Sequence, residues 1–203
     1  DEWIRQRSGI ATRYYVEPGQ KPSELAHVAV QRALEAAHLE AGEIDLIILA
    51  TLSAEAEFPG TSFFLHDRLG LSETPCFDLR AQCSGFVYSL SVANAFVRSG
   101  QYRRVLVIGC EVHSTGIDLT TEGREVAVLF GDGAGAVVVE ANEDPDDSGE
   151  ILEVRLHAEG QHADKLWIEA PGSAFQPVRI THELIDQKRH FPRMQGRLVF
   201  KHA

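Results

Sequence analysis

Two continuous apolar runs, IDLIILAT (44–51) and RRVLVIGC (103–110), constrain the fold most strongly. Runs of this length are typical of strands that are buried on both faces of a parallel sheet. Between them lie two segments with helical spacing and one shorter strand pattern: TSFFLHDRL (61–69), SGFVYSLSVANAFVRSG (84–100) and TPCFDL (74–79). Alternating strand and helix patterns predict an α/β layer fold with a largely parallel sheet and right-handed crossovers.

The flanking segments extend this pattern. PSELAHVAVQRALEAAHL (22–39) has apolar residues at helical spacing and a proline at its expected start, so it predicts an amphipathic helix. ILEVRLHAEG (151–160) predicts a further strand. From residue 161 to residue 193 the pattern weakens, because three prolines interrupt it, and we expect a loop-rich excursion.

The segment VAVLFGDGAGAVVVEA (126–141) contains two apolar, strand-like runs around the glycine-rich sequence GDGAG (131–135). Glycine-rich loops can bind phosphate when a helix follows them. Here a strand-like run follows instead, which supports neither a dinucleotide site nor a P-loop. We therefore interpret the glycines as a place of tight backbone packing near an active site.

Composition excludes several classes of protein. The 203 residues carry a formal charge of −11, which argues against nucleic acid as a partner. Much of this charge lies in the run EANEDPDDSGE (140–150), which we expect to be a solvated loop between two strands. No apolar stretch is long enough for a membrane span, and no secretory leader is visible. The three cysteines fit reduced thiols of a cytosolic protein, and none has the spacing of a metal site.

Cys83 stands where the strand pattern CFDL gives way to a helical run. In an open α/β sheet, ligands bind beyond the carboxyl ends of the strands, so its sulfur should lie on the binding side. The partial positive charge of a helix N-terminus favours a thiolate, which is the nucleophilic form. The local pattern alone leaves two possibilities open: a nucleophile, or a small buried residue of the kind that free cysteines often are.

Read together, five segments resemble β-ketoacyl-acyl carrier protein synthase III, a family of thiolase-like condensing enzymes. They are DEWIRQRSGIATRYY, IDLIILATLSAEAEFP, CFDLRAQCSGFVYSLSVANAFVRSG, RRVLVIGCEVHS and VLFGDGAGAVVV, and the similarity returns at MQGRLVFKHA (194–203). The resemblance implies an α/β/α/β/α architecture with a mixed, largely parallel sheet, of which this chain is the N-terminal half. It divides residues 1–203 into a core (1–160), an irregular excursion (161–193) and the start of the C-terminal half (194–203).

The resemblance also implies roles for individual residues. Cys83 matches the nucleophile that takes an acyl group from acyl-CoA before a malonyl group on acyl carrier protein loses CO₂ and attacks the thioester. Trp3 and Arg7 match contacts to the adenine end of coenzyme A, and Arg124 matches a basic contact at the pocket mouth. Phe58 matches a residue that the other subunit of the family's homodimer places against the acyl pocket.

Two features depart from the family pattern. The family's catalytic His and Asn belong to the second half of the fold, and none of the nine histidines here matches that His. His113 is the only histidine expected near the pocket, in a structural role. The chain also starts at Asp1, after the family's first strand. We therefore expect the 203 residues alone not to catalyse the condensation.

The expected function is acyl transfer with carbon–carbon bond formation in fatty acid or polyketide biosynthesis, in a cytoplasmic homodimer that needs no metal or redox cofactor. Its substrates would be acyl-CoA and malonyl-acyl carrier protein. Three alternatives remain: a non-catalytic partner subunit of a condensing enzyme, an olefin-pathway enzyme that joins two acyl chains, and a cysteine hydrolase. Olefin-pathway relatives carry a glutamate directly before the proline that corresponds to Pro59, where this chain has Phe58 and Glu57 is one residue away.

Overall fold

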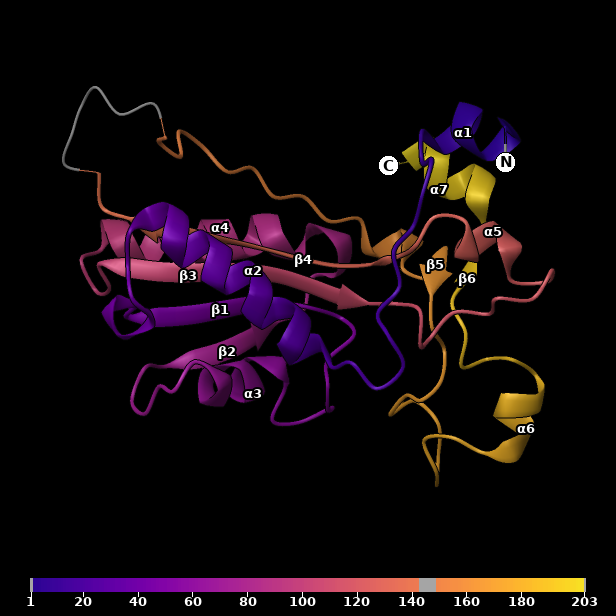
Figure 1. Ribbon diagram of the computed structural model, residues 1–203. Helices are drawn as coiled ribbons and strands as arrows, with labels where there is room; N and C mark the ends of the chain where they lie inside the picture. The colour runs from indigo at the N-terminus through magenta and orange to yellow at the C-terminus, as the bar shows by residue number, and fades with distance from the viewer. Residues whose placement is uncertain (1, 143–148, 203) are drawn as a thin grey trace. The chain divides into compact units, whose positions relative to one another are not determined.

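The structure, a computed structural model, describes residues 2–142 and 149–202. It divides into two compact units, each built from segments that are distant in the sequence (Figure 1). We call Val16–Val112 with Asp132–Leu156 the sheet unit, and Asp1–Tyr15, His113–Gly131 and His157–Ala203 the small unit. Residues 143–148, the centre of the acidic run predicted to be a solvated loop, lie outside the described residues.

The sheet unit contains a four-stranded sheet with the order β2-β1-β3-β4. Its strands are β1 (Leu46–Ala50), β2 (Cys76–Leu79), β3 (Arg104–Val112) and β4 (Asp132–Glu140). β1 lies parallel to both β2 and β3, whereas β4 pairs with β3 in the antiparallel direction. The predicted mixed, largely parallel sheet is thus confirmed.

Helices cover both faces of this sheet. On one face, Ile47 and Leu49 of β1 belong to a buried cluster with α2 (Pro22–Ala37) and α3 (Thr61–Arg68). On the other face, Leu46 and Ile48 pack against α4 (Gly85–Arg98). A strand whose alternate residues face two helical layers must be apolar at every position. This burial explains the continuous apolar runs in the sequence.

The helix and strand boundaries follow the sequence pattern closely. Pro22 occupies the first turn of α2, where its missing N–H does no harm, and the chain after α4 reaches Gly100 with a positive φ of 73°. Two 3₁₀ turns, η1 (Ala41–Glu43) and η2 (Gln82–Ser84), precede β1 and α4 respectively. The second of these turns carries the cysteine that the sequence placed at the strand–helix junction.

The prediction around GDGAG is wrong in two respects. The apolar run before it is no strand: it forms the short helix α5 (Arg124–Ala127), in which the N–H groups of Val126 and Ala127 donate to the carbonyl of Gly123, and a turn that follows this helix. GDGAG itself is no loop either, because β4 begins at Asp132 and includes four of its five residues opposite β3. Short apolar runs do not by themselves distinguish a helical turn from a strand.

The predicted strand at 151–160 is also absent: residues 151–159 have no regular secondary structure. A strand needs a neighbour for its backbone hydrogen bonds and a core for its apolar face. Leu152 is 83% exposed, so its side chain has no such core. The alternating hydrophobicity of this segment predicted a strand, but such a pattern does not show whether a neighbouring strand is present to pair with it.

The small unit contains only short elements. They are α1 (Glu2–Ser8), α5, η3 (Gly160–His162), α6 (His182–Asp186), α7 (Gly196–His202) and a two-stranded antiparallel ladder of β5 (Leu166–Trp167) and β6 (Arg193–Met194). Arg13 donates through Nε to the carbonyl oxygen of Val128 at 2.7 Å, which ties the N-terminal segment to α5. The predicted division at residues 160 and 193 stays a prediction. No helix within 2–142 or 149–202 combines the length and hydropathy that crossing a bilayer requires.

Candidate active site

Cys83 lies in η2, one residue after Gln82 and two residues before α4 begins. β2 ends at Leu79, so the thiol stands at the carboxyl edge of the parallel strands, as the sequence predicts. Gln82 has a φ of 48°, in the left-handed region that favours glycine. Such strained backbone in a non-glycine residue is concentrated at functional sites, because the surrounding structure must hold it in place.

The turn is held close to β1 by a glycine. A methyl group placed on Gly85 would lie 3.1 Å from Cβ of Ala50, so this position leaves almost no space for a side chain. The close approach brings the first turn of α4 onto the carboxyl end of β1. As a result, the positive end of the 14-residue helix is directed at the segment that carries Cys83.

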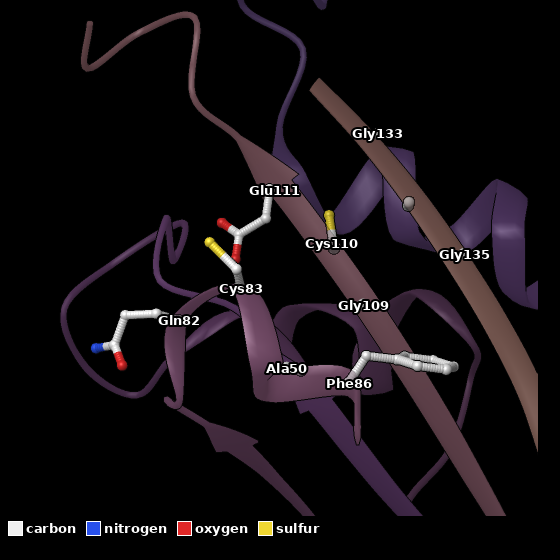
Figure 2. A pocket seen from close by; sticks show the side chains of 10 residues that line it. Ala50, Gln82, Cys83, Phe86, Gly109, Cys110, Glu111, Gly133 and Gly135 are labelled. Atoms are coloured by element: carbon white, nitrogen blue, oxygen red, sulfur yellow. The ribbon is translucent and has the colours of Figure 1, made fainter. Parts of the chain in front are cut away.

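A pocket of about 200 Å³ opens beside this turn, within the sheet unit. Figure 2 shows its lining, which comes from η2, from the carboxyl ends of β1 and β3, and from the first residues of β4 and of α4. The lining residues are Ala50, Gln82, Cys83, Phe86, Gly109, Cys110, Glu111, Gly133, Ala134 and Gly135.

The glycines of β4 make room in the pocket. A methyl group placed on Gly133 or Gly135 would meet no atom within 4 Å, whereas one on Gly109 would lie 3.3 Å from the ring of Phe86. Gly133 and Gly135 pair with Glu111 and Gly109 of β3 respectively. Gly133 and Gly135 therefore leave open space next to the thiol. The tight packing that the sequence predicted is found only at Gly131, where a methyl group would lie 3.2 Å from the carbonyl oxygen of Tyr14.

The three cysteines differ sharply in exposure. Cys83 is exposed, Cys76 is partly buried and Cys110 is 1% exposed. Burial raises the pKa of the Cys110 thiol to about 12, and the neighbouring carboxylate of Glu111 adds to this shift. Burial also raises the pKa of the Cys76 thiol. Since only a thiolate attacks efficiently, Cys76 and Cys110 are disfavoured as nucleophiles, as expected of core residues.

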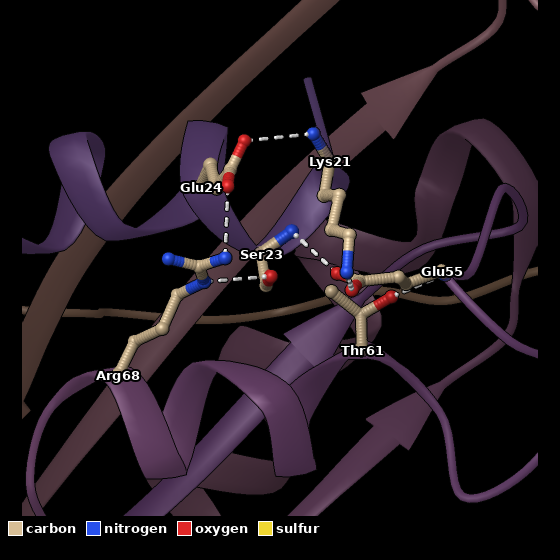
Figure 3. Close-up of polar contacts among 6 residues, drawn as sticks. All are labelled: Lys21, Ser23, Glu24, Glu55, Thr61 and Arg68. Atoms are coloured by element: carbon tan, nitrogen blue, oxygen red, sulfur yellow. Dashed lines mark hydrogen bonds and ion pairs between the residues drawn. The ribbon is translucent and has the colours of Figure 1, made fainter. Parts of the chain in front are cut away.

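Phe58 lies in the loop between β1 and α3 and is 85% exposed. Figure 3 shows how the middle of this loop is fixed. Glu55 accepts a hydrogen bond from the backbone N–H of Ser23 at 3.2 Å and pairs with Lys21 at 3.5 Å. The Glu55 N–H in turn donates to the hydroxyl of Thr61 at 2.9 Å. The loop is anchored to α2 and α3 while the Phe58 ring faces solvent.

Trp3, Arg7 and Arg124 all lie in the small unit. Trp3 is 63% exposed, and the guanidinium carbon of Arg7 lies 4.8 Å from the centre of its ring, one helical turn along α1. This cation–π pair keeps an aromatic face and a positive charge together at the surface. Arg124 is the first residue of α5. The roles that the resemblance gives to these three residues stay predictions.

His113 also lies in the small unit, where its ring packs edge-on against Phe130 with 5.1 Å between the centroids. This contact is consistent with the structural role that the sequence predicts. In the part of the chain that the structure describes, no group of three or more His, Cys, Asp or Glu side chains is arranged to hold a metal ion.

Glu111 is the pocket residue that the sequence analysis missed. It is the last residue but one of β3, an otherwise apolar strand from Val105 to Cys110. A charged side chain at the carboxyl end of a buried parallel strand points to a site at that edge of the sheet. That signal was visible in RRVLVIGCEV, but the predicted strand stopped at residue 110.

Comparison with known proteins finds similarity to one family. Residues 77–160, which include Cys83 and Arg124, match the family model of 3-oxoacyl-[acyl-carrier-protein (ACP)] synthase III. A beta-ketoacyl-[acyl-carrier-protein] synthase III from Rhodospirillum rubrum is 45% identical over 206 residues, which cover 100% of this chain and 60% of that protein. The chain thus spans about 60% of the length of the curated relatives it matches.

Solved structures agree with the sequence match. The 3-oxoacyl-[acyl-carrier-protein] synthase III of Aquifex aeolicus superposes with a TM-score of 0.83 and 39% identity, over 100% of this chain and 58% of that one. The corresponding enzyme of Pseudomonas aeruginosa gives a TM-score of 0.82 and 32% identity, over 100% and 57%. The thiolase-like fold and the resemblance seen in the sequence are confirmed: the chain is similar along its whole length to β-ketoacyl-acyl carrier protein synthase III.

Proposed function

We propose that the chain carries the acyl-accepting site of a β-ketoacyl-acyl carrier protein synthase III, with Cys83 as its nucleophile. The observation that carries this proposal is the contrast among the three thiols. Cys83 alone is exposed, and it stands in a pocket at the carboxyl edge of the sheet and at the start of a long helix. Cys110 lines the same pocket but is held as a buried thiol with a pKa of about 12.

In the proposed reaction the Cys83 thiolate attacks the carbonyl carbon of an acyl-CoA. The carbonyl oxygen becomes an oxyanion, for which the positive end of α4 is a favourable neighbour. The carbon–sulfur bond to coenzyme A then breaks, coenzyme A leaves as a thiolate that takes up a proton, and the acyl group stays on Cys83. Acyl transfer of this kind requires no redox cofactor, because no electrons are exchanged with an outside donor or acceptor.

The second half-reaction uses malonyl-acyl carrier protein as the extender. Loss of CO₂ leaves a carbanion at the extender, and this carbon attacks the acyl thioester to form the new bond and release Cys83. Donors aimed at the extender's thioester oxygen are needed as negative charge develops there, and losing one such donor typically costs ~10²–10³ in rate. By resemblance, those donors are a His and an Asn that no residue of this chain matches.

Trp3, Arg7 and Arg124 are proposed to bind the coenzyme A part of the primer. An exposed tryptophan next to an arginine suits a nucleotide, because the ring can stack on a base while the guanidinium meets a phosphate. We also propose a cytoplasmic homodimer in which Phe58 reaches the acyl pocket of the other subunit. The exposure of the Phe58 ring on an anchored loop supports this role.

The test is acylation of Cys83. The protein is incubated with acetyl-CoA, quenched in acid, and analysed by intact mass and peptide mapping. We expect one acetyl group per chain on the peptide that contains Cys83, and none in the Cys83→Ala variant. An acetyl group on Cys76 or Cys110, with Cys83 unmodified, would overturn the assignment of the nucleophile. A protein that takes up no acetyl group and releases no acetate would instead be a non-catalytic partner subunit.

The olefin-pathway alternative is less well supported. By resemblance, that chemistry uses a glutamate directly before the loop proline, and Phe58 occupies this place. A hydrolase is distinguished by the fate of the acyl group: it would release acetate and leave Cys83 free at steady state. The mass of the quenched protein after several minutes therefore separates a stable acyl-enzyme from turnover by water.

A further inference from the structure

Glu111 places a carboxylate in the pocket that holds Cys83. It belongs to the end of β3 and is partly buried, and Figure 2 shows its side chain pointing toward the turn that carries the thiol. A carboxylate at this place needs an explanation, because its negative charge raises the pKa of the neighbouring Cys110 thiol. Negative charge opposes a thiolate, so the benefit of this side chain must lie elsewhere.

The carboxylate is tied to the segment that follows β1. Its Oε1 accepts a hydrogen bond from the N–H of Leu52 at 3.0 Å. Its Oε2 accepts from both the N–H and the hydroxyl of Ser53, at 3.2 and 2.5 Å. The Ser53 hydroxyl also accepts from the N–H of Val112 at 2.8 Å. Hydrogen bonds to an ionised acceptor are the stronger kind, so these contacts join the carboxyl ends of β1 and β3 firmly.

Residues 50–52 contact the chain both before and after the turn that carries Cys83. Before the turn, the N–H of Thr51 donates to the carbonyl of Leu79 at 3.2 Å, and Arg80 donates to the carbonyl of Leu52 at 3.3 Å. After the turn, Gly85 approaches Ala50 so closely that a methyl group there would lie 3.1 Å away. Residues 50–53 thus form the support on which the strained Gln82–Cys83 turn rests.

We propose that Glu111 is a positioning residue for acyl transfer: its carboxylate holds residues 51–53 in place, and these residues set the position of Cys83 relative to the incoming thioester. The role rests on the proposed function of Cys83. Nucleophilic attack is sensitive to such placement, because a misplacement of 1 Å can cost about a hundredfold in rate. Simple alkylation of a thiolate by a small, freely diffusing reagent needs no such placement.

The experiment compares these two reactions in Glu111→Gln and Ser53→Ala. The maximal rate of Cys83 acylation by acetyl-CoA should fall about tenfold to a hundredfold in Glu111→Gln, with a nearly unchanged half-saturating concentration. The rate of Cys83 alkylation by iodoacetamide should change less than about threefold in the same variant. Because the two side chains act as a unit, the double variant should lose little more than Glu111→Gln alone.

Glu35→Gln is the matched control, since it removes the same charge from an exposed position on α2. It should leave both rates unchanged. If Glu111→Gln acylates as fast as the wild type, or if acylation and alkylation fall together, the positioning role is wrong while the nucleophile assignment stands. If the wild type takes up no acetyl group, the proposed function fails, and this inference fails with it. Should Glu111→Gln not fold, Ser53→Ala alone decides, with the same split expected between the two reactions.

Discussion

The two compact units of the chain are stabilised in different ways. Both buried apolar clusters lie in the sheet unit, where β1 and β3 supply most of the fully buried side chains. In the small unit, the buried apolar side chains are Ile117, Val126, Ala170 and Leu184. Ion pairs join distant segments in both units, but in the small unit they accompany this much smaller apolar core: Lys188 pairs with Asp118 and Glu122, and Arg189 pairs with Glu169.

The candidate residues divide in the same way. The pocket that Cys83 lines lies wholly in the sheet unit, whereas Trp3, Arg7 and Arg124 lie in the small unit. Bond-making chemistry needs atoms fixed to within fractions of an ångström, and a packed sheet provides that. Recognition of a remote part of the substrate tolerates exposed side chains on short helices. We therefore expect substitutions in the sheet unit to change rates and those in the small unit to change substrate affinity.

The largest expected effect separates two thiols of the sheet unit. At pH 8, iodoacetamide should label Cys83 at least ~10³ times faster than Cys110, because a thiol with a pKa of about 12 is almost entirely protonated at that pH. Peptide mapping at successive times measures both rates. In 8 M urea the difference should vanish, which controls for intrinsic reactivity. Equal labelling of the native protein would mean that the core around Cys110 opens readily.

The second effect is a loss of stability of the sheet unit in alkali. The folded pKa of Cys110, about 12, lies above its ordinary value of 9.0, so the buried thiol stabilises the fold fully below pH 9. This contribution is lost as the pH rises toward 12. Between pH 9 and pH 11 the wild type should lose ~2–3 kcal/mol that Cys110→Ala does not lose. Urea unfolding followed by far-UV circular dichroism measures it, and parallel losses in both proteins would contradict it.

The sequence predicted the sheet unit well for a physical reason. Residues such as Ile47 and Ile48 face opposite helical layers, so every position of the strand is buried and its sequence is a continuous apolar run. The helices that cover the sheet likewise have one apolar face each. Where burial is one-sided or absent the pattern fails, as it does at 151–159. The short elements of the small unit come from three separate segments, and no local periodicity reports their assembly.

The residues of the candidate site also differ in how far a local sequence pattern can predict them. Cys83 could be placed at the carboxyl edge of the sheet, because strand and helix patterns meet there. Glu111 could have been placed at the same edge from RRVLVIGCEV, but its positioning role could not be predicted, since that role depends on hydrogen bonds to Leu52 and Ser53, which lie about 60 residues away in the sequence. The proposed coenzyme A contacts rest on resemblance alone, because hydrophobic periodicity identifies buried positions and cannot identify exposed binding residues such as Trp3 and Arg7.

The third effect lies in the small unit and concerns affinity. Arg7→Ala should raise the acetyl-CoA concentration that half-saturates Cys83 acylation about tenfold, with the maximal rate nearly unchanged, because a contact remote from the chemistry binds ground state and transition state alike. Arg5→Ala is the matched control: it removes the same charge from α1 but lies two positions from Trp3, on another side of the helix. An unchanged half-saturation in Arg7→Ala would leave Arg7 as an ordinary surface charge.

The smallest effect should appear in acid and only in the small unit. Hydrogen bonds from Thr120 and Lys188 lower the pKa of Asp118 to about 2, from an ordinary value of 3.8. A lowered folded pKa stabilises the fold above pH 3.8, and this contribution is lost as the pH falls toward 2. Since Lys188 is partly exposed, solvent weakens the ion pair and the loss is modest. Asp118→Asn should therefore be less stable than the wild type at neutral pH, and the gap should narrow below pH 3.8. Tryptophan fluorescence follows this unit selectively, because both tryptophans, Trp3 and Trp167, belong to it.

Asp186→Asn, an exposed change on α6, is the control and should leave the acid transition unchanged. A gap between Asp118→Asn and the wild type that stays constant down to pH 2 would show that the carboxylate charge does not hold this unit together.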